Sequence, residues 1–133
     1  MKNKYELSDF FTRTKNENAS KMELLLGEEK TGHYLMVKGG EAKSIQRDKI
    51  VAQVGYADTE EKIKTIKDKI ERETMKRDLN EQVEINYALA LIDDWSFGKF
   101  DLDQLKTLLE ENRGLALSVI GFSATNDNYL EKK

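Results

Sequence analysis

The stretch ALIDDWSFGKFDLDQL, residues 90–105, holds four acidic residues, the only tryptophan of the chain and two phenylalanines. We expect a buried helix to end near Trp95 and Gly98 to turn the chain. Asp101 stands three residues before Gln104, which is the spacing of a capping box at the start of the next helix. The stretch therefore predicts a helix, a corner and a second helix.

The acids of this stretch invite a catalytic or metal-binding interpretation, because paired carboxylates can hydrolyse glycosides or bind Mg²⁺. Asp93 and Asp94 would diverge by about 100° on a helix. Asp101 has a role as an N-cap, and Asp103 lies in the first helical turn, where the helix dipole favours acids. The spacing of an EF-hand is absent. We therefore expect no catalytic residue, no metal site and no cofactor here.

Length and composition favour one domain over residues 1–133, with a modest core and a heavily charged surface. The chain has no cysteine, so disulfides and thiolate metal sites are excluded, and a reducing cytoplasmic setting fits. No run of about 18 apolar residues predicts a membrane span. A net charge of −3 gives no global attraction to nucleic acid.

Two runs near the N-terminus alternate apolar and polar residues around a short loop, which predicts a β-hairpin within about residues 20–40. Each run places three residues on one face: Met22, Leu24 and Leu26 in the first, and His33, Leu35 and Val37 in the second. Before the hairpin, we expect a short helix capped by Ser8, with Phe10 and Phe11 reaching inward. The lone His33 has no matched nucleophile in sequence and is expected to be structural or exposed.

Helical patterns dominate about residues 41–124. One stripe consists of Ala42, Ile45, Lys49 and Ala52. Asp58 precedes Glu61 by three residues, so a further helix is expected to begin there. Farther on, Leu79, Val83 and Ala90 fall almost opposite Ile66 and Ile70. Either this helix breaks near Asp78, or one long helix meets different neighbours along its length.

The expected fold class is therefore α+β and predominantly helical: a small N-terminal β-hairpin followed by four or five helices. A polar C-terminal tail, residues 125–133, follows them. It carries Tyr129 and Leu130 and either docks on the domain or waits for a partner. There is no internal repeat and no low-complexity linker.

Two further motifs give weak signals of ligand binding. KGGEAKS, residues 38–44, lacks the spacing of a phosphate-binding P-loop. The lysine-rich run over residues 58–82 contains eight acids against seven bases and predicts a solvated helix face, without a basic stripe for nucleic acid. The function class that these observations leave open is binding to another protein. Trp95, Phe97 and Phe100 cluster around a glycine and could be core or interface residues, and Tyr129 and Leu130 join them as candidate partner-binding residues.

The order of these segments resembles the tail assembly chaperones of long-tailed bacteriophages and prophages. Those proteins show a G-x-x-L-x-V-x-G strand, a buried helix ending in a Trp motif, an LLxxNxxL helix and an Asn-Tyr/Phe-Leu near the C-terminus. The matching residues are Gly32, Leu35, Val37, Gly39, Trp95, Phe97, Leu108, Leu109, Asn112, Leu115, Ile120, Asn128, Tyr129 and Leu130. Arg113 stands where the family often has a proline. The similarity covers roughly residues 30–131.

The resemblance implies a non-enzymatic protein of the host bacterial cytoplasm. It would bind the tape measure protein, a long helical protein, and keep it soluble while tail tube protein polymerises around it. Tail tube protein is a possible second partner, and a homo-oligomer is possible. The alternative is a structural phage protein, such as a head–tail connector or a tail completion protein.

Overall fold

A three-stranded antiparallel sheet in the order β1–β2–β3 forms one end of the molecule. The computed structural model describes residues 4–130. Strands β1 (Ser20–Leu26) and β2 (Glu29–Val37) form the hairpin that the alternating runs predict. Gly27 in the connecting turn has a φ of 63°, a left-handed conformation that suits glycine.

The third strand, β3 (Ile92–Trp95), corrects the expectation of a helix through Trp95. The preceding helix ends at Leu91, whose carbonyl oxygen accepts a hydrogen bond from the backbone N–H of Lys38 at 2.7 Å. Beyond that point Trp95 pairs with Leu35 of β2. Pairing with β2, which is distant in sequence, supplies the backbone hydrogen bonds that another helical turn would otherwise make. A local helical pattern cannot reveal such a pairing.

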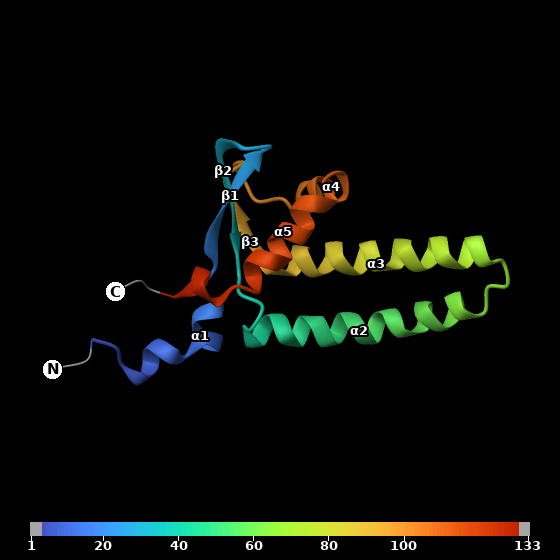
Figure 1. Cartoon of the computed structure of the whole chain (residues 1–133), viewed down its shortest axis with the longest axis horizontal. Helices are drawn as coiled ribbons and strands as arrows, with labels where there is room; N and C mark the ends of the chain where they lie inside the picture. Colours follow the sequence, from blue (N-terminus) through green and yellow to red (C-terminus); the bar gives the residue numbers. More distant parts are fainter. Residues whose placement is uncertain (1–3, 131–133) are drawn as a thin grey trace.

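Two long helices, α2 (Lys43–Lys64) and α3 (Lys69–Leu91), run antiparallel and project from the sheet end of the molecule (Figure 1). The new helix expected at Asp58 is wrong, because α2 continues past that residue. The chain turns after Lys64, and Asp68 caps α3 by accepting the backbone N–H of Ile70 at 3.1 Å. Helix α3 then continues unbroken past Asp78, and the interruption lies earlier, at residues 65–68. Neither alternative left open by the sequence is therefore right: the break is not near Asp78, and the pattern is not one long helix.

Helices α4 (Leu102–Glu111) and α5 (Arg113–Ser123) follow β3 and pack against α3. The N-cap predicted at Asp101 is confirmed: its carboxylate accepts the backbone N–H groups of Asp103 and Gln104 at 2.9 and 3.2 Å. Asn112 ends α4 and caps α5. The hydrophobic core joins β2 and β3 to the inner faces of the helices; its large members include Leu35, Ile45, Leu91, Trp95, Leu105 and Leu109.

The N-terminal segment differs from its expectation. It forms a 3₁₀ helix, η1 (Leu7–Phe10), followed by the short helix α1 (Thr12–Asn16), and η1 is capped by Glu6 instead of Ser8. Phe10 and Phe11 are 70% and 50% exposed, so the expectation that they reach inward is wrong. The segment extends away from the sheet, where no apolar layer is available to bury these rings (Figure 1).

The fold class is α+β and predominantly helical, as the sequence predicts, with β3 as the unexpected element. The last described element is the 3₁₀ helix η2 (Asn126–Tyr129), in the predicted tail; residues 131–133 of that tail lie outside the described residues. No helix among residues 4–130 is long and apolar enough to cross a membrane.

Candidate functional site

The aromatic cluster predicted around Gly98 divides into a buried part and an exposed part. Trp95 is only 7% exposed, and its indole Nε1–H donates to the carbonyl oxygen of Lys99 at 3.2 Å. Its ring meets those of Phe97 and Phe100 edge to face, with centroids 5.5 and 5.6 Å apart. Trp95 therefore anchors the core and is not accessible to a partner.

Phe97, by contrast, is 46% exposed and stacks on the ring of His33, with 4.0 Å between ring centroids. His33 Nδ1 lies 2.9 Å from Ser96 Oγ, which also accepts the backbone N–H of Tyr34 at 2.8 Å. These contacts join the end of β3 to β2 at the surface. The Ser96–His33 pair thus has a structural role, and Phe97 remains the exposed member of the predicted aromatic set.

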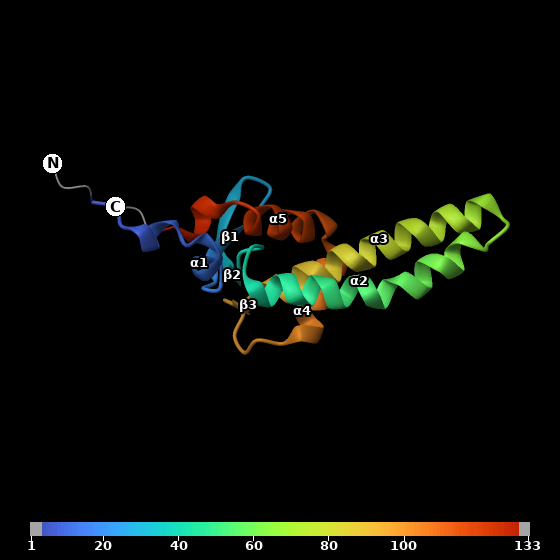
Figure 2. The same ribbon diagram turned by 90° about the horizontal axis from the view of Figure 1, so that it is seen from below.

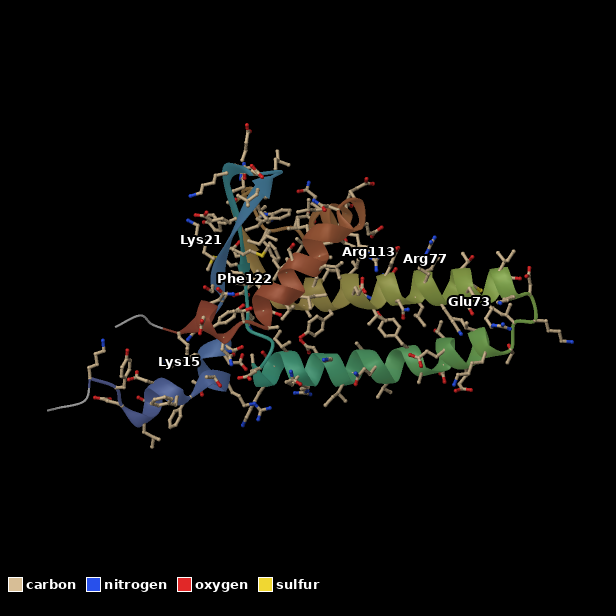
Figure 3. All side chains as sticks on the ribbon, viewed as in Figure 1. Lys15, Lys21, Glu73, Arg77, Arg113 and Phe122 are labelled. Carbon is tan, nitrogen blue, oxygen red and sulfur yellow. The ribbon has the colours of Figure 1, made fainter. Side chains whose placement is uncertain are left out.

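The C-terminal pair docks on the domain. Tyr129 is 8% exposed and meets Phe122 of α5 edge to face, while Leu130 is half-buried. Figure 3 shows Phe122 on α5. The Tyr129 hydroxyl is buried without a hydrogen-bond partner among residues 4–130, and its burial raises the pKa of that hydroxyl well above its usual value. Between the two possibilities left by the sequence, the described part of the tail therefore packs back.

The replacement Tyr129→Phe is expected to raise the free energy of unfolding by about 1 kcal/mol, because a buried unpaired hydroxyl costs about 1–3 kcal/mol of desolvation. Urea unfolding measures the change, and Tyr34→Phe, at a partly buried ring on the sheet, is the matched control, expected to leave stability nearly unchanged. A loss of more than about 1 kcal/mol in Tyr129→Phe would mean that this hydroxyl stabilises the fold.

A groove of about 540 Å³ lies between α2 and α3 and is bordered by α5; we call it the α2–α3 groove. Its apolar and aromatic lining comes from all three helices: Ile45, Ala52, Tyr56, Val83, Tyr87, Ala90 and Ile120. Ala90 is exposed and Ala52 is half-buried, so the small side chains leave the surface open. The groove is therefore a hollow, mostly apolar surface between two long helices.

Two contacts hold the walls of the groove together. The Asn86 side chain on α3 donates to the Tyr56 hydroxyl on α2. The ammonium group of Lys49 on α2 lies 5.4 Å from the centroid of the Tyr87 ring on α3, a cation–π arrangement. Burial raises the pKa of Tyr87, and a hydrogen bond with Ser123 acts in the opposite direction. Tyr87 therefore stays neutral near pH 7 and serves as an apolar wall with a polar edge.

The border of the groove is mainly acidic. Glu41, Asp48 and Glu84 line it, against Lys49 as a lining cation. Arg113 at the start of α5 partly compensates this charge, because its Nη2 lies 3.2 Å from a carboxylate oxygen of Glu84 (Figure 3). These groups surround the apolar lining with solvated charge, as is typical of a protein-binding surface.

Sequence reasoning did not identify this groove, although it identified parts of both walls. The stripe that includes Ile45, Lys49 and Ala52 forms one wall, and Val83 and Ala90 contribute to the other. The helical spacing of each stripe is a signal that the sequence contains, and it predicts an apolar face on each helix. It does not predict that the two faces lie opposite each other, because that depends on the turn at residues 65–68, which has no clear sequence signal.

The acids of the opening stretch do not converge on a site. Asp93 and Asp94 lie on β3, so the expected divergence on a helix does not apply to them, and Asp101 and Asp103 lie at the start of α4. Within residues 4–130, no three side chains of the metal-ligating types come close enough to hold an ion.

The chain matches no family model, no curated protein and no solved structure.

Proposed function

We propose that this protein is a tail assembly chaperone of a long-tailed bacteriophage or prophage. In this role it binds helical segments of the tape measure protein in the α2–α3 groove, and keeps that protein soluble in the host cytoplasm during assembly of the tail tube. The single observation that carries the proposal is the open apolar groove between two long helices. The sequence resemblance, which names the partner, is its second support.

Several residues of the resemblance have identifiable structural roles, which supports the use of the pattern. Gly32 has a φ of 81° in β2, where a residue with a side chain would be strained. Leu35 and Val37 are fully buried in the sheet, and Leu109 is fully buried in α4. The pattern therefore follows positions on which this fold depends.

The dimensions and chemistry of the groove suit a helix. From Ile45 to Tyr56 its α2 wall extends about 17 Å, at 1.5 Å per residue, or about three helical turns. An amphipathic helix of that length presents apolar anchors at i, i+3 or i+4, and i+7, and such helices bind by laying their apolar face into a groove. Small residues such as Ala52 and Ala90 leave room for larger side chains of the client.

A chaperone must release its client, so its binding surface should be shallow and wet at its edges. The polar border formed by Glu41, Asp48 and Lys49 meets this requirement, because interactions between solvated charges contribute little net affinity. The chain is 35% charged and acidic overall, which favours solubility of a complex with an aggregation-prone client.

Co-expression with the tape measure protein encoded beside this chain tests the proposal. We expect a soluble complex, together with a higher soluble fraction of the tape measure protein than when it is expressed alone. Ala90→Arg places a long charged side chain in the groove and is expected to abolish that gain. Leu102→Arg, at a position 61% exposed on α4 and outside the groove, is the control and is expected to keep it.

Two outcomes would contradict the proposal. In the first, the tape measure protein stays insoluble and no complex forms although this chain is folded. In the second, the complex forms equally well with Ala90→Arg, so that binding would not involve the groove. Circular dichroism and urea unfolding of both variants establish that they are folded.

A further inference from the structure

Helix α2 has a second apolar surface on the side away from the groove. Ile50, Val51 and Val54 are 61%, 65% and 72% exposed. At about 100° per residue, they point roughly opposite to Lys49, Ala52 and Tyr56, which line the groove. In the view from below, no other element covers α2 (Figure 2). The client proposed above therefore leaves this outer face of α2 unoccupied.

Charged residues border this outer face in a defined order. Arg47, Val51, Val54 and Asp58 are spaced by four, three and four residues, which is the spacing of a coiled-coil seam. The N-terminal end of the seam is basic and its C-terminal end is acidic. All four residues are exposed, and among residues 4–130 neither Arg47 nor Asp58 forms an ion pair within the chain.

This pattern is complementary to itself when two copies run antiparallel. With the two-fold axis level with the midpoint between Ala52 and Gln53, Val51 lies level with the partner's Val54. The same axis places Arg47 level with the partner's Asp58, and each of these pairs occurs twice. A parallel arrangement would instead place Arg47 beside its own copy and Asp58 beside its own copy, which like charges disfavour.

Residues on both flanks of the seam satisfy the same geometry. Lys43 and Glu61 lie on one side of the seam at about the same angle around α2, so Lys43 comes within one residue of level with the partner's Glu61. Gly55 lies on the other side, and nothing occupies the space where its side chain would be, so the partner helix can approach closely there. The match of charge, apolar surface and shape therefore extends over about 27 Å of α2, from Lys43 to Glu61.

We propose that the outer face of α2 is a homodimer interface, in which α2 packs antiparallel against α2 of a second copy around a two-fold axis. Such an interface is isologous and closed, so it produces dimers without further growth. The α2–α3 groove lies on the other side of the helix and stays open, so each dimer offers two client-binding grooves. Dimerisation is thus independent of client binding.

Charge reversal tests the dimer by sedimentation velocity over a concentration series. The unmodified chain is expected to show a monomer–dimer equilibrium. Arg47→Glu places an acid opposite the partner's Asp58 twice, and Asp58→Arg does the same with bases. Each change is expected to raise the dimer dissociation constant at least about tenfold, the factor that corresponds to 1.4 kcal/mol. Since both positions are exposed, the urea midpoint of the monomer is expected to stay unchanged.

The double variant Arg47→Glu/Asp58→Arg distinguishes the antiparallel pairing from any other. In the antiparallel dimer it exchanges the two charges and restores dimerisation, whereas in a parallel pair it would keep like charges together. Co-expression with the tape measure protein is expected to give the same soluble complex with Arg47→Glu as with the unmodified chain. The dimer proposal would be overturned by a chain that stays monomeric throughout, by single variants that dimerise normally, or by a double variant that fails to recover.

Discussion

The replacement Trp95→Ala is expected to lower the free energy of unfolding by about 3–5 kcal/mol, the range for removal of a large buried aromatic side chain. Trp95 is 7% exposed, pairs with Leu35 across the sheet and contacts two phenylalanine rings edge to face. Its loss would also remove the hydrogen bond to the carbonyl oxygen of Lys99. Because β3 is short, we expect the sheet end of α3 to loosen along with it.

Phe97→Ala is the matched control for this prediction. Phe97 is close in sequence and also aromatic, but it is 46% exposed and stacks mainly on His33. Its replacement is expected to cost about 1 kcal/mol or less, the range for an aromatic pair near the surface. Urea unfolding followed by circular dichroism measures both variants. Equal losses in the two would contradict the division of the aromatic cluster into a buried anchor and an exposed ring.

Gly39→Ala is the second replacement with a large expected effect, a loss of about 2–4 kcal/mol. A Cβ added at Gly39 would overlap the side chain of Asn16, which is fully buried. Asn16 donates to the carbonyl oxygen of Thr12 at 2.6 Å and accepts the backbone N–H of Glu41 at 3.2 Å. Displacing it would leave buried polar groups unpaired, at about 1–3 kcal/mol each. One of the hydrogen bonds between α1 and the start of α2 would then be lost.

The neighbouring glycine provides the control for Gly39→Ala. A Cβ at Gly40 would lie 3.3 Å from the Tyr87 hydroxyl, a tight contact with the end of a side chain that can adjust. Gly40→Ala is therefore expected to cost clearly less than Gly39→Ala, as measured by urea unfolding. If Gly39→Ala were as stable as the unmodified chain, the buried Asn16 would not be the support that its contacts indicate.

The elements predicted with success share a strong local signal. The hairpin follows from period-two alternation, and α4 follows from the cap at Asp101 and leucines at helical spacing. The long apolar patterns of α2 and α3 predict helices, although the capping spacing at Asp58 placed the boundary too early. That spacing is common in charged helices and does not force an end, whereas the actual cap, Asp68, follows a turn with no glycine or proline to mark it.

What the sequence could not reveal depends on contacts between distant residues. Strand β3 exists because Trp95 reaches Leu35, some 60 residues earlier, and the residues Ile92 to Trp95 lack a clean strand pattern of their own. Phe10 and Phe11 are large and apolar, so a local pattern places them inward, but within residues 4–130 no element buries them. The groove depends on the mutual orientation of α2 and α3, which no single stripe specifies. Local pattern therefore predicted the elements, and tertiary pairing determined the site.

The most direct test of the central claim, that the α2–α3 groove holds a helix of the tape measure protein, is site-specific photo-crosslinking. A photoreactive amino acid is placed at position 90, within the groove, and separately at position 102 on α4, and each variant is co-expressed with the tape measure protein. We predict a crosslinked complex from position 90 and none from position 102. A complex that forms but crosslinks only from position 102, or equally from both positions, would contradict the claim.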